Sequence, residues 1–413
     1  METITKKQNR LKAFSLRDNT MMLALIGGLI IFQIIVQAVR GTNFITPVNI
    51  TNLINQKAYI IILAVGMLNC ILTGGNIDLS VGSNVAMVTA TAGVLIITNH
   101  MNVYLAMPIC IALGTLAGAI QAYFIAYVGV PPFITTLAGM LIYRGVTYAI
   151  LTGGNTISPF PIEMKQFFTG FLLQDLEPQT RILVCVVIGV VISAAFIIFS
   201  VLSWIRKNKK DYPVQPLAAL LIKDLIMAAA VVVVFYFFGA HSGVPIVLIS
   251  TAIVVVVYHI FTSVSVPGRH LYAIGGNRKA TEFSGINTKR SMFFAYTNMG
   301  FLCGIAALVG AARFDAAMPS MGTSWEMDAI GSCFIGGASA YGGSGTVRGA
   351  VIGALFMGVL DMGLTMLTLG EDIKRMIKGI VILAAVVLDV LMQKNSASGQ
   401  GLFARLFPKK AAI

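Results

Sequence analysis

Apolar runs of about 20 residues recur along the whole chain, and they restrict its fold more than any other feature. Hydrophobic residues make up 57% of the 413 positions, whereas charged residues make up only 11%. Soluble domains carry about 25% charged residues. The composition therefore excludes a soluble enzyme, a disordered chain and a disulfide scaffold, and it predicts an all-α fold, that of a polytopic helical membrane protein.

The apolar runs predict about 12 transmembrane spans within one membrane domain, residues 20–392. The segment 328–343 is rich in glycine, so a broken or re-entrant helix is the alternative to a full span there. The run beginning at Met21 is too long for the core of a cleaved signal peptide, and it is expected to remain as the first span. The candidate spans are 20–39, 57–74, 80–98, 103–128, 132–152, 181–204, 217–239, 244–264, 291–313, 328–343, 346–369 and 373–392.

The positions of Lys and Arg predict the orientation, because cytoplasmic loops of membrane proteins are enriched in these residues. Most of the 29 Lys and Arg fall in segments that lie inside if both termini are cytoplasmic. The basic residues Lys374, Arg375 and Lys378 are an exception, since they lie near the predicted outer end of the last span. The predicted cytoplasmic segments are the N-terminal tail 1–19, the basic linker 206–216, the loop 268–290 and the C-terminal tail 393–413.

Two further features concern the organisation of the chain. The hydrophilic segment 156–180 is predicted to be the largest external loop, and it is too short to form a separate domain. The hexapeptide ILTGGN occurs at 71–76 and again at 150–155. The predicted topology places the two copies at opposite faces, as an inverted repeat would; chance is the alternative in a chain of such biased composition.

The motif TGGNIDLSVGS, residues 73–83, interrupts an apolar run with two glycines and then polar residues. A carboxylate in apolar surroundings needs water, a partner or free backbone amides. Asp78 is predicted to cap the next helix, which would begin near Leu79. A polar turn and direct contact with a transported solute are the alternatives. The candidate residues are Thr73, Gly74, Gly75, Asn76, Asp78 and Ser80.

A second glycine-rich segment is IGGASAYGGSGTVRG, residues 335–349. Glycines permit close approach of backbones or a non-helical excursion within a membrane protein. The phosphate-binding pattern Gly-x-x-x-x-Gly-Lys-Ser/Thr is absent from the chain, so no nucleotide-hydrolysing site of that kind is present. The glycines singled out are Gly336, Gly337, Gly342, Gly343 and Gly345.

The predicted cytoplasmic loop 268–290 contains a short capped helix. Asn277 is a suitable N-cap and Gly285 a suitable left-handed stop, which predicts a two-turn helix over 278–284. Such a helix suits docking to another protein, and an amphipathic surface turn is the alternative. The candidate residues are Gly275, Gly276, Asn277, Arg278, Lys279, Ala280, Thr281, Glu282, Ser284 and Gly285.

Other ligands find little support in the sequence. The net charge of +13 does not indicate nucleic acid, because Lys and Arg flank apolar runs instead of forming one basic patch. The four histidines are scattered and the five cysteines lack CxxC spacing, so neither a metal site nor a cofactor is expected. Charges within the spans are few, and no run of carboxylates marks a proton relay. The candidates are Arg144, Asp224, His259, Asp361 and Asp389.

Four ordered motifs carry a resemblance to a known family. They are TGGNIDLSVGS, VPPFITTLAGMLIYRG at 130–145, GRHLYAIGGNRKATEFSGI at 268–286, and WEMDAIGSCFIGGASAYGGSGTVRGAVIGAL at 325–355. From about residue 40 to 392 the chain resembles the permease subunits of bacterial ABC importers for monosaccharides, the ribose, xylose and arabinose group. Within that group it is most similar to xylose-type or multiple-monosaccharide permeases.

The resemblance implies a non-catalytic subunit of the bacterial inner membrane that forms the pathway for a pentose or hexose. It also implies three kinds of partner: an ATP-binding subunit that hydrolyses ATP, an external sugar-binding protein and a second permease copy. The loop 268–290 would contact the ATP-binding subunit, and the segment 73–80 would lie near the translocation path. Two departures stand out: the stretch 160–262 is longer than in ten-span members, and Asn76 varies the usual glycine motif.

A different class of transporter is the main alternative. A secondary, ion-coupled transporter acting alone would also use broken helices and inverted repeats. Such a protein needs ion-coupling polar groups within the bilayer, and those are sparse here. A membrane enzyme is less favoured still, because no nucleophile–base or metal pattern is visible.

Overall fold

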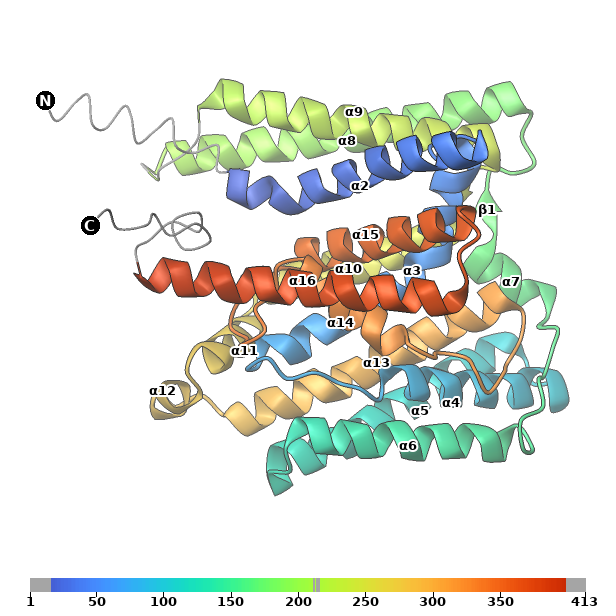
Figure 1. Cartoon of the computed structure of the whole chain (residues 1–413), viewed down its shortest axis with the longest axis vertical. Coiled ribbons are helices and arrows are strands. Elements are labelled where there is room, and N and C mark those ends of the chain that lie inside the picture. The colour runs from blue at the N-terminus through green and yellow to red at the C-terminus, as the bar shows by residue number, and fades with distance from the viewer. Residues whose placement is uncertain (1–15, 211, 213–215, 399–413) are drawn as a thin grey trace, which may run out of the picture. The chain divides into compact units, whose positions relative to one another are not determined.

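The computed structural model describes residues 16–210, 212 and 216–398, and these are almost entirely helical (Figure 1). The predictions for the ends of the two tails and for part of the linker 206–216 lie outside the described residues. The elements are α2 (Leu16–Arg40), α3 (Pro47–Leu72), α4 (Val81–Gly93) with the π-helical turn Val94–Thr98, α5 (Val103–Tyr123) with the π-helical turn Phe124–Val128, α6 (Pro132–Ile150), α7 (Ile162–Thr169), β1 (Phe171–Leu172), α8 (Pro178–Asn208), α9 (Leu217–His241), β2 (Val244–Pro245), α10 (Ile246–Val264), α11 (Val266–Gly276), α12 (Arg278–Phe283), α13 (Thr288–Phe314), α14 (Trp325–Ile335), α15 (Val347–Met366) and α16 (Glu371–Ser398).

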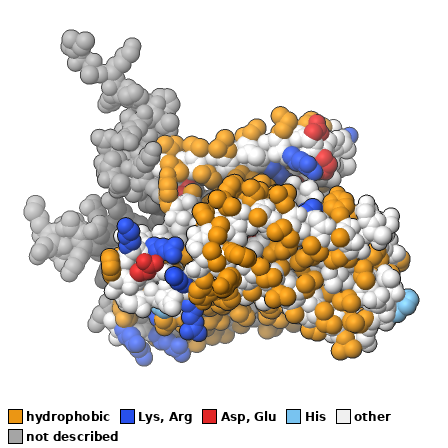
Figure 2. Space-filling view, turned by 90° about the horizontal axis from the view of Figure 1, so that it is seen from below, with side chains coloured by type: hydrophobic (Ala, Val, Ile, Leu, Met, Phe, Trp, Pro, Cys, Tyr) orange, Lys and Arg blue, Asp and Glu red, His pale blue; other side chains and the backbone are white. Residues whose placement is uncertain are grey.

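Ten of the described helices are long and apolar enough to cross a membrane. This confirms the predicted class, a polytopic helical membrane protein. The count of twelve spans is not confirmed, because α14 is short and α16 begins with the charged stretch EDIKR. Figure 2 shows the apolar surface that such helices present, with hydrophobic side chains over most of the face in view.

The chain divides into two compact units. The first contains the described residues up to Asn55 together with Gly170–Leu248. Its helices α8 and α9 pack along each other, and the Cα of Gly189 lies so close to Phe235 that an added Cβ would meet that side chain at 2.8 Å. The antiparallel pair β1–β2 connects the segment before α8 with the end of α9.

The second unit contains Gln56–Thr169 and the described residues from Ile249 onward. Its centre is α13, which is buried along most of its length against α4 and α5. Two pairs of glycines at four-residue spacing face each other there, Gly114 and Gly118 on α5 and Gly300 and Gly304 on α13. A Cβ at Gly118 would lie 2.8 Å from the Cα of Gly300, so these helices approach closely because small residues line both faces.

The glycine-rich segment 328–343 does not form the continuous span that its apolar residues predicted. Helix α14 ends at Ile335, and residues 336–346 follow without helical structure. Gly337, Gly342 and Gly343 have positive φ, a conformation that ends a right-handed helix. The broken-helix alternative therefore describes this segment.

Two other predicted boundaries shift by small amounts. Helix α4 begins at Val81 and not near Leu79, because residues 79 and 80 form a turn. Helix α12 ends at Phe283, one residue before the predicted end. The loop before α12 contains a further helix, α11, which the sequence analysis did not predict.

The two copies of ILTGGN share several local features. Each ends a helix, α3 in the first copy and α6 in the second, and both glycines of each copy have positive φ. In each the Asn Nδ2 donates to the Thr carbonyl oxygen, at 3.3 Å in 71–76 and 3.5 Å in 150–155. The hexapeptide thus acts as a helix stop in both places, and an ancestral duplication stays a hypothesis.

The segment 156–180, predicted as an external loop, contains the helix α7 and the strand β1. Within the second unit α7 is held by Lys165, whose Nζ lies 3.0 Å from Oδ2 of Asp315. The backbone N–H of Phe160 donates to the other oxygen of the same carboxylate at 2.9 Å. The loop is therefore anchored at the end of α13.

Candidate functional site

The candidate site is built around the break between α3 and α4, which Figure 1 shows as a non-helical blue stretch. Gly74 and Gly75 have φ of 127° and 73°, values that side chains rarely permit. The hydroxyl of Thr73 donates to the carbonyl oxygen of Cys70 at 2.7 Å, and Nδ2 of Asn76 lies 3.1 Å from that hydroxyl. Local hydrogen bonds thus replace the helical bonds that end at Leu72.

Asp78 is buried in this break, with 3% of its surface exposed. Its Oδ1 accepts a hydrogen bond from the backbone N–H of Ser80 at 2.9 Å, and the hydroxyl of Ser80 lies 2.7 Å from the same oxygen. The same hydroxyl lies 3.1 Å from Oε1 of Gln121 on α5. Asp78 therefore satisfies a free amide just before α4, although Ser80 and not Asp78 occupies the N-cap position.

Three segments that the sequence analysis singled out separately meet at one place in the second unit. The backbone N–H of Gly343 donates to the carbonyl oxygen of Leu72 at 3.1 Å. A Cβ at Gly75 would lie 2.0 Å from the carbonyl oxygen of Ala340, and one at Gly342 would lie 2.5 Å from the Cα of Gly74. Backbones pack directly on each other here, which only glycine allows.

The third segment is the end of α11. A Cβ at Gly275 would lie 2.1 Å from the carbonyl oxygen of Leu72 and 2.2 Å from the nitrogen of Gly343. The hydroxyl of Tyr272 donates to the carbonyl oxygen of Gly345 at 2.9 Å. We call this contact of residues 72–75, 272–275 and 340–345 the glycine junction. Gly336 lies elsewhere, packed on Gly349 of α15.

Helix α12 begins two residues after the glycine junction, following Gly276 and Asn277. Oδ1 of Asn277 accepts from the backbone N–H of Ala280 at 3.1 Å, and Gly285 has φ of 82°, as the capping pattern predicted. Thr281 is buried, and its hydroxyl lies 2.8 Å from the carbonyl oxygens of Ala273 and Asn277, which ties α12 to α11. Phe283, in contrast, is 91% exposed.

The exposed polar face of α12 is stabilised by Glu282. Oε1 of this residue accepts from the hydroxyl of Thr288 at 2.7 Å and from Nε of Arg278 at 3.1 Å. The hydrogen bond from Thr288, followed by the one from Arg278, lowers the pKa of Glu282. The hydrogen bond from Thr288 joins the end of α12 to the start of α13, whereas the one from Arg278 lies within α12.

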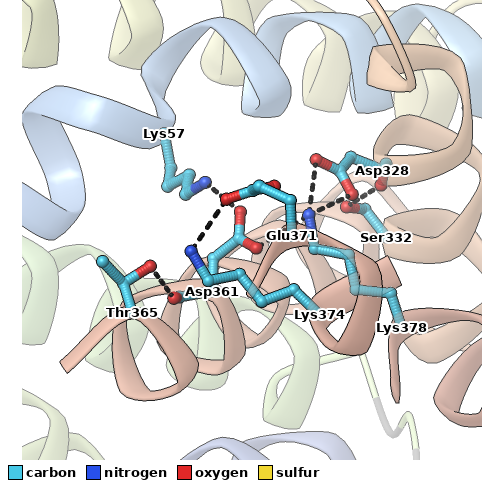
Figure 3. Close-up of polar contacts among 8 residues, drawn as sticks. All are labelled: Lys57, Asp328, Ser332, Asp361, Thr365, Glu371, Lys374 and Lys378. Carbon is cyan, nitrogen blue, oxygen red and sulfur yellow. Dashed lines mark hydrogen bonds and ion pairs between the residues drawn. The ribbon is translucent and has the colours of Figure 1, made fainter. Parts of the chain in front are cut away.

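A partly buried network of ion pairs was missed by the sequence analysis (Figure 3). Nζ of Lys57 lies 2.5 Å from Oδ2 of Asp361, and Nζ of Lys378 lies 2.8 Å from Oδ1 of the same carboxylate. Lys378 also lies 3.0 Å from Oδ1 of Asp328. The network joins α3, α14, α15 and α16, and two positive charges balance two negative ones.

Ion pairs account for two of the three basic residues that disagreed with the positive-inside pattern, Lys374 and Lys378. Lys378 is neutralised by carboxylates from other helices, and Lys374 pairs with Glu371 at 2.8 Å. Asp361 had been noted as an intramembrane charge, but nothing in the sequence indicates its partners. Within the part of the chain that the structure describes, no three His, Cys, Asp or Glu residues lie close enough together to hold a metal ion.

Apolar helices, a glycine-lined break and buried polar groups of balanced charge define the class, which is a multi-span membrane transport protein. The chain belongs to the family described as "Branched-chain amino acid transport system / permease component", whose model matches residues 49–386. Members of this class are transport subunits.

Individual relatives agree with this assignment. The chain is 31% identical to the xylose transport system permease protein XylH of Haemophilus influenzae, over 94% of this chain and 99% of the relative. It is 31% identical to XylH of Escherichia coli K12, over 94% and 95%. It is 29% identical to the ribose import permease protein RbsC of Escherichia coli K12, over 94% and 98%. No solved structure matches the chain.

Proposed function

We propose that this chain is the transmembrane permease subunit of an ATP-driven importer and forms the pathway for a monosaccharide. The observation that carries the proposal is the 31% identity to a xylose permease along nearly the full length of both proteins. The pentose or hexose would be delivered by an external binding protein. Both termini would lie in the cytoplasm of a bacterial cell, and a second copy of the chain would complete the pathway.

The buried chemistry of the second unit supports an uncharged solute. The four charges of the ion-pair network neutralise one another, so they offer no net charge to a substrate. Asp78 is hydrogen-bonded to Ser80, whose hydroxyl lies against Gln121, and both of these buried side chains are neutral hydrogen-bonding groups. Such groups match sugar hydroxyls, which both donate and accept hydrogen bonds.

Energy would come from a separate ATP-binding subunit that docks on α12. The chain lacks the phosphate-binding pattern, and α12 presents an aromatic side chain, Phe283, that is 91% exposed beside the basic residues Arg278 and Lys279. An exposed aromatic flanked by charges is typical of an anchor that fills a pocket on a partner. The glycine junction would pass motion of α12 to the α3–α4 break.

Uptake by whole cells tests the energy source. Cells that lack this gene would receive it back on a plasmid, and the uptake of radiolabelled D-xylose and D-ribose would be measured. We expect the restored uptake to stop when arsenate depletes ATP and to continue with a protonophore while ATP is maintained. Uptake that stops with the protonophore alone would instead support an ion-coupled secondary transporter, and no restored uptake of either sugar would contradict the proposed substrates.

Copurification tests the docking surface. Phe283→Ala should reduce the amount of ATP-binding subunit that copurifies with the chain and should lower sugar uptake in parallel. Phe199→Ala on α8 is the matched control, because it removes the same side chain from a position that is 72% exposed. Equal copurification for the two variants would exclude Phe283 as the anchor.

A further inference from the structure

Several buried polar atoms in the second unit have no hydrogen-bond partner among the described residues. Three of them are Oδ1 of Asn84 on α4, Nε2 of Gln121 on α5 and the hydroxyl of Tyr296 on α13. These residues are 2%, 4% and 0% exposed. Each unsatisfied buried group costs about 1–3 kcal/mol, so such groups are rare in folded proteins unless a partner binds at some stage.

The three groups lie around the break at Asp78. The hydroxyl of Ser80 lies 3.1 Å from Oε1 of Gln121, and Asp78 is close enough to Tyr296 for the two side chains to interact electrostatically. The carbonyl oxygen of Tyr296 lies against Gly118, one turn of α5 before Gln121.

The neighbouring helices complete the enclosure. Asn84 lies one turn of α4 after Ser80, and its Nδ2 lies 3.3 Å from the carbonyl oxygen of Gly114 on α5. On α6 a Cβ at Gly139 would lie 2.1 Å from Nε2 of Gln121, so glycine is required there to admit the amide. Three neutral groups from three packed helices therefore remain unpaired in one region.

We infer that Asn84, Gln121 and Tyr296 form a hydroxyl-binding site for a neutral polyhydroxylated solute on the transport path. This inference rests on the proposed function. The unpaired atoms offer an acceptor, a donor and a hydroxyl that does both, which is the set that a sugar with several hydroxyl groups satisfies. A charged solute would require a counter-charge, and the carboxylate beside the break, Asp78, is already hydrogen-bonded to Ser80.

Access to this site requires a second conformation. The groups are enclosed in the present structure, beside the α3–α4 break with its two glycines. The glycine junction connects that segment to α11, so a movement of α12 reaches it through direct backbone contacts. The site is therefore closed in this state and open in another state of the cycle.

Tyr296→Phe is the most direct test, because it removes one hydroxyl and little else. The complete transporter, with its ATP-binding subunit and loaded binding protein, would be reconstituted in vesicles and its ATP-driven uptake of D-xylose and D-ribose measured. Because an unpaired buried hydroxyl contributes nothing favourable to folding, we expect unchanged or raised thermal stability together with a 3- to 10-fold loss of uptake rate, roughly the effect of one hydrogen bond. Thr251→Val on α10 is the control, since Thr251 is also buried with an unpaired hydroxyl but lies outside this cluster.

Deoxy sugars separate a binding role from a structural one. If Tyr296 contacts a sugar hydroxyl, the wild-type transporter should take up the deoxy analogue that lacks this hydroxyl more slowly than the parent sugar. The Tyr296→Phe transporter should take up the analogue and the parent sugar at equal rates. Additive losses for every analogue, or unchanged uptake in Tyr296→Phe, would overturn the inference. Gln121→Met, tested in the same way, covers the case in which Tyr296→Phe fails to fold. If the wild-type transporter moves neither sugar, the proposed function fails instead.

Discussion

The backbone N–H of Gly343 donates a hydrogen bond of 3.1 Å to the carbonyl oxygen of Leu72, which joins the loop after α14 to the last residue of α3. The last carbonyls of a helix lack partners within the helix, so this bond satisfies one of them. Gly275 of α11 packs on the same two atoms. The end of α3 is therefore held by the loop after α14 and by the end of α11 at once.

The glycine junction predicts opposite outcomes for two adjacent substitutions. Gly275→Ala should destabilise the protein by at least about 2 kcal/mol, because its Cβ would overlap backbone atoms that cannot move aside. Gly276→Ala is the matched control: nothing lies within 4 Å of its added Cβ, and alanine favours a helix over glycine by up to about 1 kcal/mol. Thermal unfolding in detergent measures both, and equal melting temperatures would refute the tight packing.

Asp78 should tolerate an amide but not an apolar side chain. Asp78→Asn keeps an oxygen that accepts from Ser80, so we expect folding to be retained. Asp78→Leu leaves a buried amide without a partner, which costs about 1–3 kcal/mol and should lower membrane insertion or thermal stability. Expression and melting temperature are the measurements, and equal values for the wild type and both variants would show that Asp78 does not stabilise the start of α4.

The ion-pair network predicts a non-additive pair of substitutions. Asp361→Asn alone leaves the partly buried Lys57 without its counter-charge, at a cost of about 1–3 kcal/mol. Adding Lys57→Met should recover part of this loss, because the remaining pair, Lys378 with Asp328, is neutral. Melting temperatures of the two single variants and the double variant form the cycle, and strictly additive losses would show that these charges do not interact.

A substitution that breaks α12 should leave membrane insertion of the chain intact but weaken its association with the ATP-binding subunit. Thr281→Pro removes the backbone N–H that donates to Asn277 and breaks the helix, at a cost of about 3 kcal/mol. The chain should still insert, but association with the ATP-binding subunit and sugar uptake should both fall. Thr281→Ser keeps the hydroxyl that reaches Ala273 and is the control. Normal association and uptake in Thr281→Pro would mean that α12 is not the coupling element.

Local features could be predicted because they depend on a few adjacent residues. Asn277 and Gly285 place the start and the end of α12 almost where the capping pattern set them. Gly74 and Gly75 likewise end α3 through their own backbone conformation. The sequence left a full span and a broken helix open at 328–343, because the segment also depends on contacts with distant residues. Gly336, for example, packs on Gly349 of the next helix.

The sequence by itself determined the class of the protein, its apolar helices and the places where glycine interrupts them, since hydropathy and backbone propensity act over one helix at a time. Only the tertiary structure decided that Lys378 pairs with Asp328 and Asp361, and that the unpaired hydroxyl of Tyr296 lies near Asp78. Electrostatic and hydrogen-bonding partners are selected by distance in space. The packing of helices sets that distance, and the packing depends on small residues spread along the whole chain.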